Sequence, residues 1–184
     1  MESENKIYRE LKKRLTTDTY DHGQKLRAEV LREEFGCSAS TVREIRFRLS
    51  SDGLVHFMDQ KGFRVLELSP TKLIEMTHLR ILLESEGAVL SIRQGGVDWE
   101  ASLTAAHHKL SHLEKRIHAR EDPTDLVDLW FTSEKEFHQT LISACGSTTL
   151  KAMHSLIYAQ FRQQLMKADR KFDFISNNIQ QHSD

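Results

Sequence analysis

The amino-acid sequence predicts a mainly α-helical protein that contains one short β-hairpin, and three observations support this fold class. Only two prolines and eight glycines interrupt 184 residues, so long helices joined by short loops are favoured. Apolar residues recur with the helical period over most of the chain, and two short runs near its middle are strand-like. A break at Ser69-Pro70 separates short elements from long ones.

The first of two predicted domains, residues 1–69, begins with three short helices. They are expected at residues 4–16, 27–35 and 38–51, with Ser38 as the N-cap of the third helix. Their inward faces follow from the spacing of apolar residues: Ile7, Leu11 and Leu15; Val30, Leu31 and Phe35; Val42, Ile45 and Leu49.

Two strand candidates follow at residues 54–58 and 63–68. Lys61-Gly62 lies near the tip of the connection between them, where glycine tolerates a positive φ. Three helices followed by a hairpin form the outline of a winged helix-turn-helix, a fold that binds DNA.

The second predicted domain, residues 70–184, is an all-α antiparallel bundle with enough residues for its own core. Pro70 and Pro123 suit the first position of a helix, each after a capping residue, Ser69 or Asp122. Helices are expected at residues 70–92, 97–119, 123–144 and 147–170, with another beginning near 174.

Composition narrows the possible settings of the protein. The sequence has no run of about 18 apolar residues, and its first residues are acidic, so we expect neither a membrane span nor a signal peptide. Two cysteines are too few for a disulfide framework, and a cytoplasmic location is expected. The net charge of −1 gives no overall basic field. Basic residues do cluster on the first helix, the third helix and the hairpin, but charge alone favours a solvated surface.

Residues 29–68 resemble the winged helix-turn-helix of GntR-type bacterial transcription regulators. The resemblance rests on Leu31, Gly36, Ser38, Val42-Arg43-Glu44, Leu49, Gly53-Leu54-Val55 and Lys61-Gly62. It implies that the third helix is a recognition helix that enters the major groove of DNA. The DNA-binding residues that it implies are Arg27, Ser38, Ser40, Thr41, Arg43, Lys61 and Gly62.

The recognition helix departs from the family pattern at three positions. Ala39 stands where relatives commonly have an arginine that reaches a guanine edge. Arg46 stands where an apolar residue is usual, and Phe47 where a charged one is usual. We therefore expect DNA binding, but not the operator sequence of relatives.

Glu134 and His138 are four residues apart on a predicted helix, so their side chains point the same way. They share a stripe with Phe131, Ile142 and Cys145, and a carboxylate on an apolar stripe needs a partner. A divalent metal is one solution, and a buried hydrogen bond between the acid and a histidine or an arginine is another. Spacing alone favours the hydrogen bond.

The remainder of the chain resembles the FCD ligand-sensing domain of the FadR-type subgroup of GntR regulators, through Arg80–Glu84, Phe137-His138 and Ala144-Cys145-Gly146. Metal-binding FCD domains have an aspartate and a histidine at this spacing, followed by a histidine some forty residues later and another beyond it. Here Glu134 stands in the aspartate position, which keeps the charge but lengthens the side chain. The resemblance thus implies a metal site at Glu134, His138 and His182 for a divalent ion, Zn²⁺ or else Ni²⁺ or Mn²⁺. A fourth ligand would follow His182, so the bundle is expected to stop about one helix short.

Arg80 shares a helical stripe with Leu73, Met76 and Leu83, which predicts that it points inward. Two interpretations are equally favoured: it binds the carboxylate of an effector, or it forms an internal salt bridge, for example to Glu134. By contrast, no convincing acid shares the stripe of His107, His108 and His112, and these are expected on the surface.

Together these features predict a transcription regulator, most often a repressor in this family, and not an enzyme. A homodimer would bind double-stranded DNA at a palindromic operator, and a small carboxylate held by the metal and Arg80 would alter that binding. One alternative is a metal-free regulator with a structural polar cluster and an apolar effector. A metal-dependent enzyme is the other, although H-E-x-x-H and phosphate-loop motifs are absent.

Overall fold

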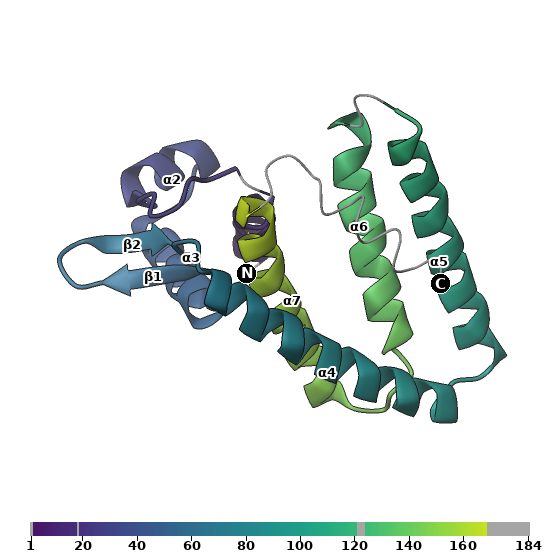
Figure 1. Ribbon diagram of the computed structural model, residues 1–184. Coiled ribbons are helices and arrows are strands. Elements are labelled where there is room, and N and C mark those ends of the chain that lie inside the picture. Colours follow the sequence, from purple (N-terminus) through teal and green to yellow (C-terminus); the bar gives the residue numbers. More distant parts are fainter. Residues whose placement is uncertain (1, 18, 121–123, 169–184) are drawn as a thin grey trace. The chain divides into compact units, whose positions relative to one another are not determined.

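The computed structural model describes residues 2–17, 19–120 and 124–168 of the chain, and it confirms the mainly α-helical fold (Figure 1). In chain order the elements are α1 (Glu2–Leu15), α2 (Ala28–Phe35), α3 (Ala39–Ser51), β1 (Val55–Met58), β2 (Gly62–Val65), α4 (Pro70–Gln94), α5 (Val97–His118), α6 (Thr124–Leu141) and α7 (Thr148–Ala168). Each lies where the sequence predicts a helix or a strand. The helix expected near 174 lies outside the described residues.

The described residues form two compact units. The first contains the chain up to Thr77 together with α7 from Leu156 onward, and the second contains His78–Ser155. Both α4 and α7 therefore contribute residues to each unit, and we call the first the winged unit and the second the bundle unit.

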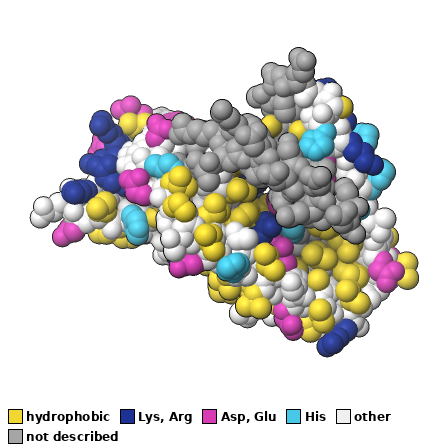
Figure 2. Space-filling model, in the orientation of Figure 1, with side chains coloured by type: hydrophobic (Ala, Val, Ile, Leu, Met, Phe, Trp, Pro, Cys, Tyr) yellow, Lys and Arg dark blue, Asp and Glu magenta, His cyan; other side chains and the backbone are white. Residues whose placement is uncertain are grey.

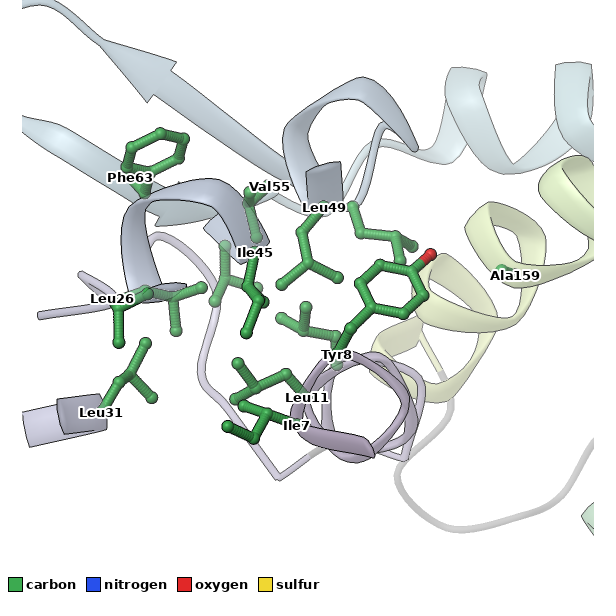
Figure 3. Packing of buried hydrophobic residues seen from close by; sticks show 14 residues of the cluster. Ile7, Tyr8, Leu11, Leu26, Leu31, Ile45, Leu49, Val55, Phe63 and Ala159 are labelled. Carbon is green, nitrogen blue, oxygen red and sulfur yellow. The ribbon is translucent and has the colours of Figure 1, made fainter. Parts of the chain in front are cut away.

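The core of the winged unit is the place where α1, α3 and the wing meet (Figure 3). The predicted faces of α1 and α3 are buried as expected, with Leu11, Ile45 and Leu49 at most 1% exposed. One prediction is wrong: Val30 is 54% exposed. The reason is that α2 has only eight residues, of which Leu31 is buried and Phe35 packs partly buried against the same core.

The wing is an antiparallel hairpin in which Val55 pairs with Val65 and Phe57 with Phe63. Its tip has positive φ angles at Gln60 (59°) and Gly62 (75°), which supports the turn predicted there. The chain before α2 pairs along the outer side of β2, because Leu26 N–H donates to the Phe63 carbonyl at 2.9 Å. This third extended segment has no signal in the sequence pattern.

The second half of α7 completes the winged unit through three glutamines. Gln160 and Gln163 donate through Nε2 to the carbonyls of Asp52 and Leu54, each at 2.9 Å. Gln164 donates to the Glu67 carbonyl at 3.2 Å and accepts from the Ser69 amide at 2.9 Å. Since Gln163 and Gln164 are at most 2% exposed, these bonds give acceptors to Nε2 groups that would otherwise be buried at high cost.

In the bundle unit, α5 packs against α6 along an apolar seam. Leu110 and Leu113 of α5 and Trp130 and Phe131 of α6 are each at most 4% exposed. Trp99 Nε1 donates to the carbonyl of Thr140 at 2.9 Å, which ties the start of α5 to the end of α6. In the part of the chain that the structure describes, no helix is both long and apolar enough to cross a membrane.

Candidate functional site

The N-terminus of α3 is a cluster of hydroxyl groups around Ser38, which is the N-cap as predicted. Ser38 Oγ accepts the Thr41 N–H at 3.1 Å and lies 2.7 Å from Ser40 Oγ and 2.9 Å from Thr41 Oγ1. Gly36, with a φ of 59°, ends α2 and turns the chain into α3. Ser38 therefore fixes the start of α3 and the hydroxyls of its neighbours, while the exposed Ser40 and Arg43 extend from the same end of the helix.

Three further residues of the predicted DNA-binding set lie outside α3. Arg27 is the exposed residue before α2, Lys61 lies exposed in the wing turn, and Gly62 begins β2. In the described part of the chain, no hydrogen bond or ion pair joins these residues to the N-terminus of α3. Their assignment to DNA thus stays a prediction from the resemblance.

Arg46 and Phe47, two of the three residues at which α3 departs from the family pattern, contact the wing. Arg46 donates from Nη1 to the Leu26 carbonyl at 3.1 Å, and its guanidinium lies 4.7 Å from the centre of the Phe63 ring. Burial lowers the pKa of Arg46. Phe47 meets Phe63 edge-on, with ring centres 5.0 Å apart. Two of the three departures from the family pattern, Arg46 and Phe47, therefore pack against the same aromatic ring of the wing, Phe63.

Several basic side chains of the winged unit form contacts within the unit that stabilise its fold. Arg48 lies 3.8 Å from the centre of the Tyr8 ring and donates to Asn5 at 3.0 Å. Lys12 pairs with Asp52 at 3.1 Å, and Arg14 pairs with Glu10 at 2.8 Å. Counting positive residues along the sequence thus overstates the charge that is available to phosphates.

A buried polar cluster occupies the bundle unit, and we define it as Arg80, Glu84, Glu134, His138 and His154. His138 lies between two carboxylates, with Nδ1 3.2 Å from Glu84 Oε2 and Nε2 3.2 Å from Glu134 Oε1. Glu84 also accepts from His154 Nε2 at 2.9 Å, since an ionised carboxylate can only accept. Arg80 is 3.5 Å from both carboxylates.

Opposite charges within the cluster set the protonation of its members. Burial alone would lower the pKa of His138, but its pairing with Glu134 and Glu84 outweighs burial and raises the pKa to about 9. Burial alone would raise the pKa of Glu84, but His138, His154 and Arg80 lower it to about 2. Near neutral pH the cluster thus holds two cations, Arg80 and His138, against two carboxylates.

The described residues fit a metal only in part. The 3.2 Å between Glu134 Oε1 and His138 Nε2 is close to the separation of two ligands on one tetrahedral zinc, about 3.3 Å for bonds near 2.0 Å. However, no group of three or more histidine, cysteine, aspartate or glutamate side chains in the described residues is arranged to hold a metal ion. The predicted third ligand, His182, lies outside the described residues.

Sequence reasoning missed two members of the cluster. Glu84 follows Arg80 by one helical turn, and His154 lies on a stripe with Leu150, Ile157 and Phe161. The spacing of both residues therefore indicates that they face inward. Arg80 does point inward, with its side chain 14% exposed, and the alternative salt bridge to Glu134 is present. The histidines of α5, at 107, 108 and 112, are exposed as expected.

Comparison with known proteins agrees with this architecture. The sequence matches two family models: bacterial regulatory proteins of the gntR family over residues 3–65, and the FCD domain over residues 75–184. Two solved structures share the fold. McbR/YncC of E. coli matches with a TM-score of 0.71 and 19% sequence identity, and the match covers 92% of this chain and 76% of that one. A putative GntR regulator of Rhodococcus sp. RHA1 matches with a TM-score of 0.72 and 17% sequence identity, and the match covers 100% of this chain and 86% of that one.

Curated relatives are named as transcription regulators, in agreement with the predicted class of protein. It is 33% identical over 141 residues to the uncharacterized HTH-type transcriptional regulator BphR of Paraburkholderia xenovorans (strain LB400), an alignment that covers 77% of this chain and 57% of BphR. It is 30% identical over 168 residues to the HTH-type transcriptional repressor GlaR of Escherichia coli (strain K12), an alignment that covers 91% of this chain and 71% of GlaR. The chain therefore belongs to the GntR family of bacterial DNA-binding transcription regulators, in the group that carries an FCD domain.

Proposed function

We propose that this regulator is a cytoplasmic repressor whose binding to a palindromic operator is controlled by a small carboxylate in the buried polar cluster. The relative GlaR is named a repressor, which supports that role. The observation that carries the proposal is that three of the five cluster residues, Arg80 and Glu84 of α4 and His154 of α7, lie on the two helices that also supply residues to the winged unit.

The path from the cluster to the recognition helix is short in sequence. His154 is two helical turns before Gln160 and Gln163 on α7, and these glutamines bond the chain at Asp52 and Leu54, where α3 ends and the wing begins. A change in α7 at His154 would therefore alter the support of α3. Such coupling requires that the effector bind two arrangements of the protein with different affinity.

Arg80 is the residue that we propose to bind the effector. Its guanidinium can fork onto a carboxylate, and its present contacts to Glu84 and Glu134 are long, at 3.5 Å each. A small anion that competes for Arg80 would disturb the balance of charge in the cluster, and it would do so on α4 and α6 together.

A divalent metal, with Zn²⁺ preferred and Ni²⁺ or Mn²⁺ possible, would be held by Glu134 and His138, with His182 as the third ligand that the resemblance implies. Bound there, it would supply a positive charge that attracts a carboxylate. Both Glu134 and His138 already lie within reach of one ion, which supports this part of the proposal.

The second candidate is a regulator without metal, and a specific observation favours it. Arg80 and protonated His138 already lie opposite the carboxylates of Glu84 and Glu134, so these carboxylates have cationic partners without a metal. A metal would have to displace the proton of His138, and this competition lowers the affinity of the site for the metal near neutral pH.

We also propose that the protein acts as a homodimer, because a palindrome presents two related half-sites. Figure 2 shows hydrophobic side chains gathered over α4. In its bundle part, Ile81, Leu82, Val89 and Ile92 share one face and are 41–69% exposed. Exposed apolar surface of this kind supports contact with a second copy through α4.

Three measurements test these proposals. Metal analysis of protein purified without chelator should find close to one ion per chain, whereas less than a tenth of an ion favours the metal-free candidate. A panel of small carboxylates should raise the melting temperature and shift the Kd for a duplex selected by the protein. Arg80→Gln should abolish both effects, while Arg93→Gln, an exposed arginine of the same helix, should keep them. A full response in Arg80→Gln would refute the role of Arg80.

A further inference from the structure

One side of α3 carries an exposed aromatic residue next to its basic residue. Ser40, Arg43 and Phe47 are three and four residues apart, so they lie on the same face, opposite the buried Val42, Ile45 and Leu49. Phe47 is 42% exposed. The face that a recognition helix turns toward DNA therefore has a polar, a basic and an apolar position in succession.

The Phe47 ring is held in place by its neighbours. Its centre lies 5.0 Å from that of Phe63, at an interplanar angle of 89°, and 5.6 Å from that of Phe57, which is itself 51% exposed. The Arg43 guanidinium lies 5.6 Å from the centre of the same ring. A rigid ring with an open edge is suited to contact with a ligand, because little freedom is lost on binding.

The major groove of DNA offers one apolar feature, the C5-methyl group of thymine, and phenylalanine is among the side chains that contact it. Phosphates and the other base edges offer only polar groups. Since the Arg43 next to Phe47 suits a guanine edge or a phosphate, the surrounding charge favours DNA over an apolar protein partner.

We propose that Phe47 is a specificity-determining residue that contacts the C5-methyl group of thymine next to the base or phosphate bound by Arg43. This inference depends on α3 being the part that enters the major groove, as in the function proposed above. It also assigns a role to a residue at which the sequence departs from its family. The operator half-site should therefore require thymine at a position where relatives with a charged residue do not.

The test removes only the methyl group. Duplexes are first selected with this protein from a random library, and each thymine of the half-site is then replaced by deoxyuridine. For the wild type we expect roughly a fourfold rise in Kd at one or two positions, the loss expected for one buried methyl group. Phe47→Ala should bind the thymine and deoxyuridine duplexes with equal affinity. Val30→Ala, which removes an exposed apolar side chain of α2, should keep the fourfold ratio.

Two further readouts separate base contact from loss of structure. Phe47→Ala should leave the slope of log Kd against log salt unchanged, whereas Arg43→Ala should lower it if Arg43 binds a phosphate. If Phe47→Ala unfolds early, Phe47→Gln serves in its place, because its side chain keeps a stem against Phe63 but has no ring. Equal binding of both duplexes by the wild type, or an unchanged ratio in Phe47→Ala and Phe47→Gln, would overturn the role of Phe47 alone. Failure to select any duplex would overturn the proposed function as well.

Discussion

Removal of the charge of Glu84 is the most informative perturbation of the buried polar cluster. Glu84 joins three helices, because it accepts from His154 of α7, lies 3.2 Å from His138 of α6 and pairs with Arg80 on its own helix. Glu84→Gln keeps the shape of the side chain and removes its charge. The cluster then retains two cations and one carboxylate.

The contribution of Glu84 to the free energy of unfolding follows from its pKa. The cluster lowers this pKa from 4.5 to about 2, and each unit corresponds to 1.36 kcal/mol, so the ionised form contributes about 3 kcal/mol to stability. That contribution is present above pH 4.5 and is lost as the pH falls toward 2. The pKa of His138 is raised from 6.5 to about 9, so its contribution is complete below pH 6.5 and is lost as the pH rises through 9.

Both contributions are therefore present between about pH 4.5 and 6.5, and the metal-free wild type should be most stable there. At pH 5.5, Glu84→Gln should lower the free energy of unfolding by about 3 kcal/mol, or the melting temperature by about 6–12 °C. At pH 9.5 the difference should shrink, because this pH lies above the pKa of His138, and most of its charge is then lost in both proteins.

The assay is thermal unfolding followed by circular dichroism in the presence of chelator, from pH 4.5 to 9.5. Glu86→Gln is the matched control, because Glu86 is exposed on the same helix and its loss should change stability by less than about 0.5 kcal/mol. A Glu84→Gln variant as stable as the wild type at pH 5.5 would refute the charge pairing. So would a difference that stays constant up to pH 9.5.

Three other changes test separate parts of the account. Arg43→Ala should weaken binding to a selected duplex by about 10- to 100-fold in a fluorescence anisotropy titration, since one good base contact is worth about 1–3 kcal/mol; an unchanged Kd would remove Arg43 from the interface. Gln163→Leu should destabilise the protein by about 1–3 kcal/mol in chemical denaturation, because the buried Leu54 carbonyl loses its donor; wild-type stability would argue against α7 as a support of the winged unit. Leu82→Glu should yield monomers in light scattering, and a persistent dimer would exclude the α4 face as the contact between copies.

Local patterns in the sequence predict most of the fold. Ser38 and Ser69 do cap their helices, since each hydroxyl accepts a backbone N–H, and the three-and-four spacing places Leu11, Ile45 and Leu49 in the core. The exposed Val30 shows the limit of this reasoning. In a helix of two turns, periodicity does not settle which apolar side chain faces the core.

The candidate sites were less accessible from the sequence, because their contacts join distant segments. Glu84 and His154 are 70 residues apart, and nothing local indicates that they pair. Gln160, Gln163 and Gln164 look like polar surface, although two of them are buried against backbone groups about one hundred residues away. The metal site remains a prediction, because its third ligand, His182, lies outside the described residues.

The most direct test of the central claim is a competition titration with two labelled duplexes, one selected by the protein and one with the same bases scrambled, with and without a carboxylate that raises the melting temperature. We predict that the selected duplex binds at least about 10³-fold more tightly at physiological salt and that the carboxylate changes this Kd about 5- to 150-fold. Equal affinity for both duplexes, or a carboxylate that binds without changing the Kd, would contradict a regulator whose buried cluster controls its recognition helix.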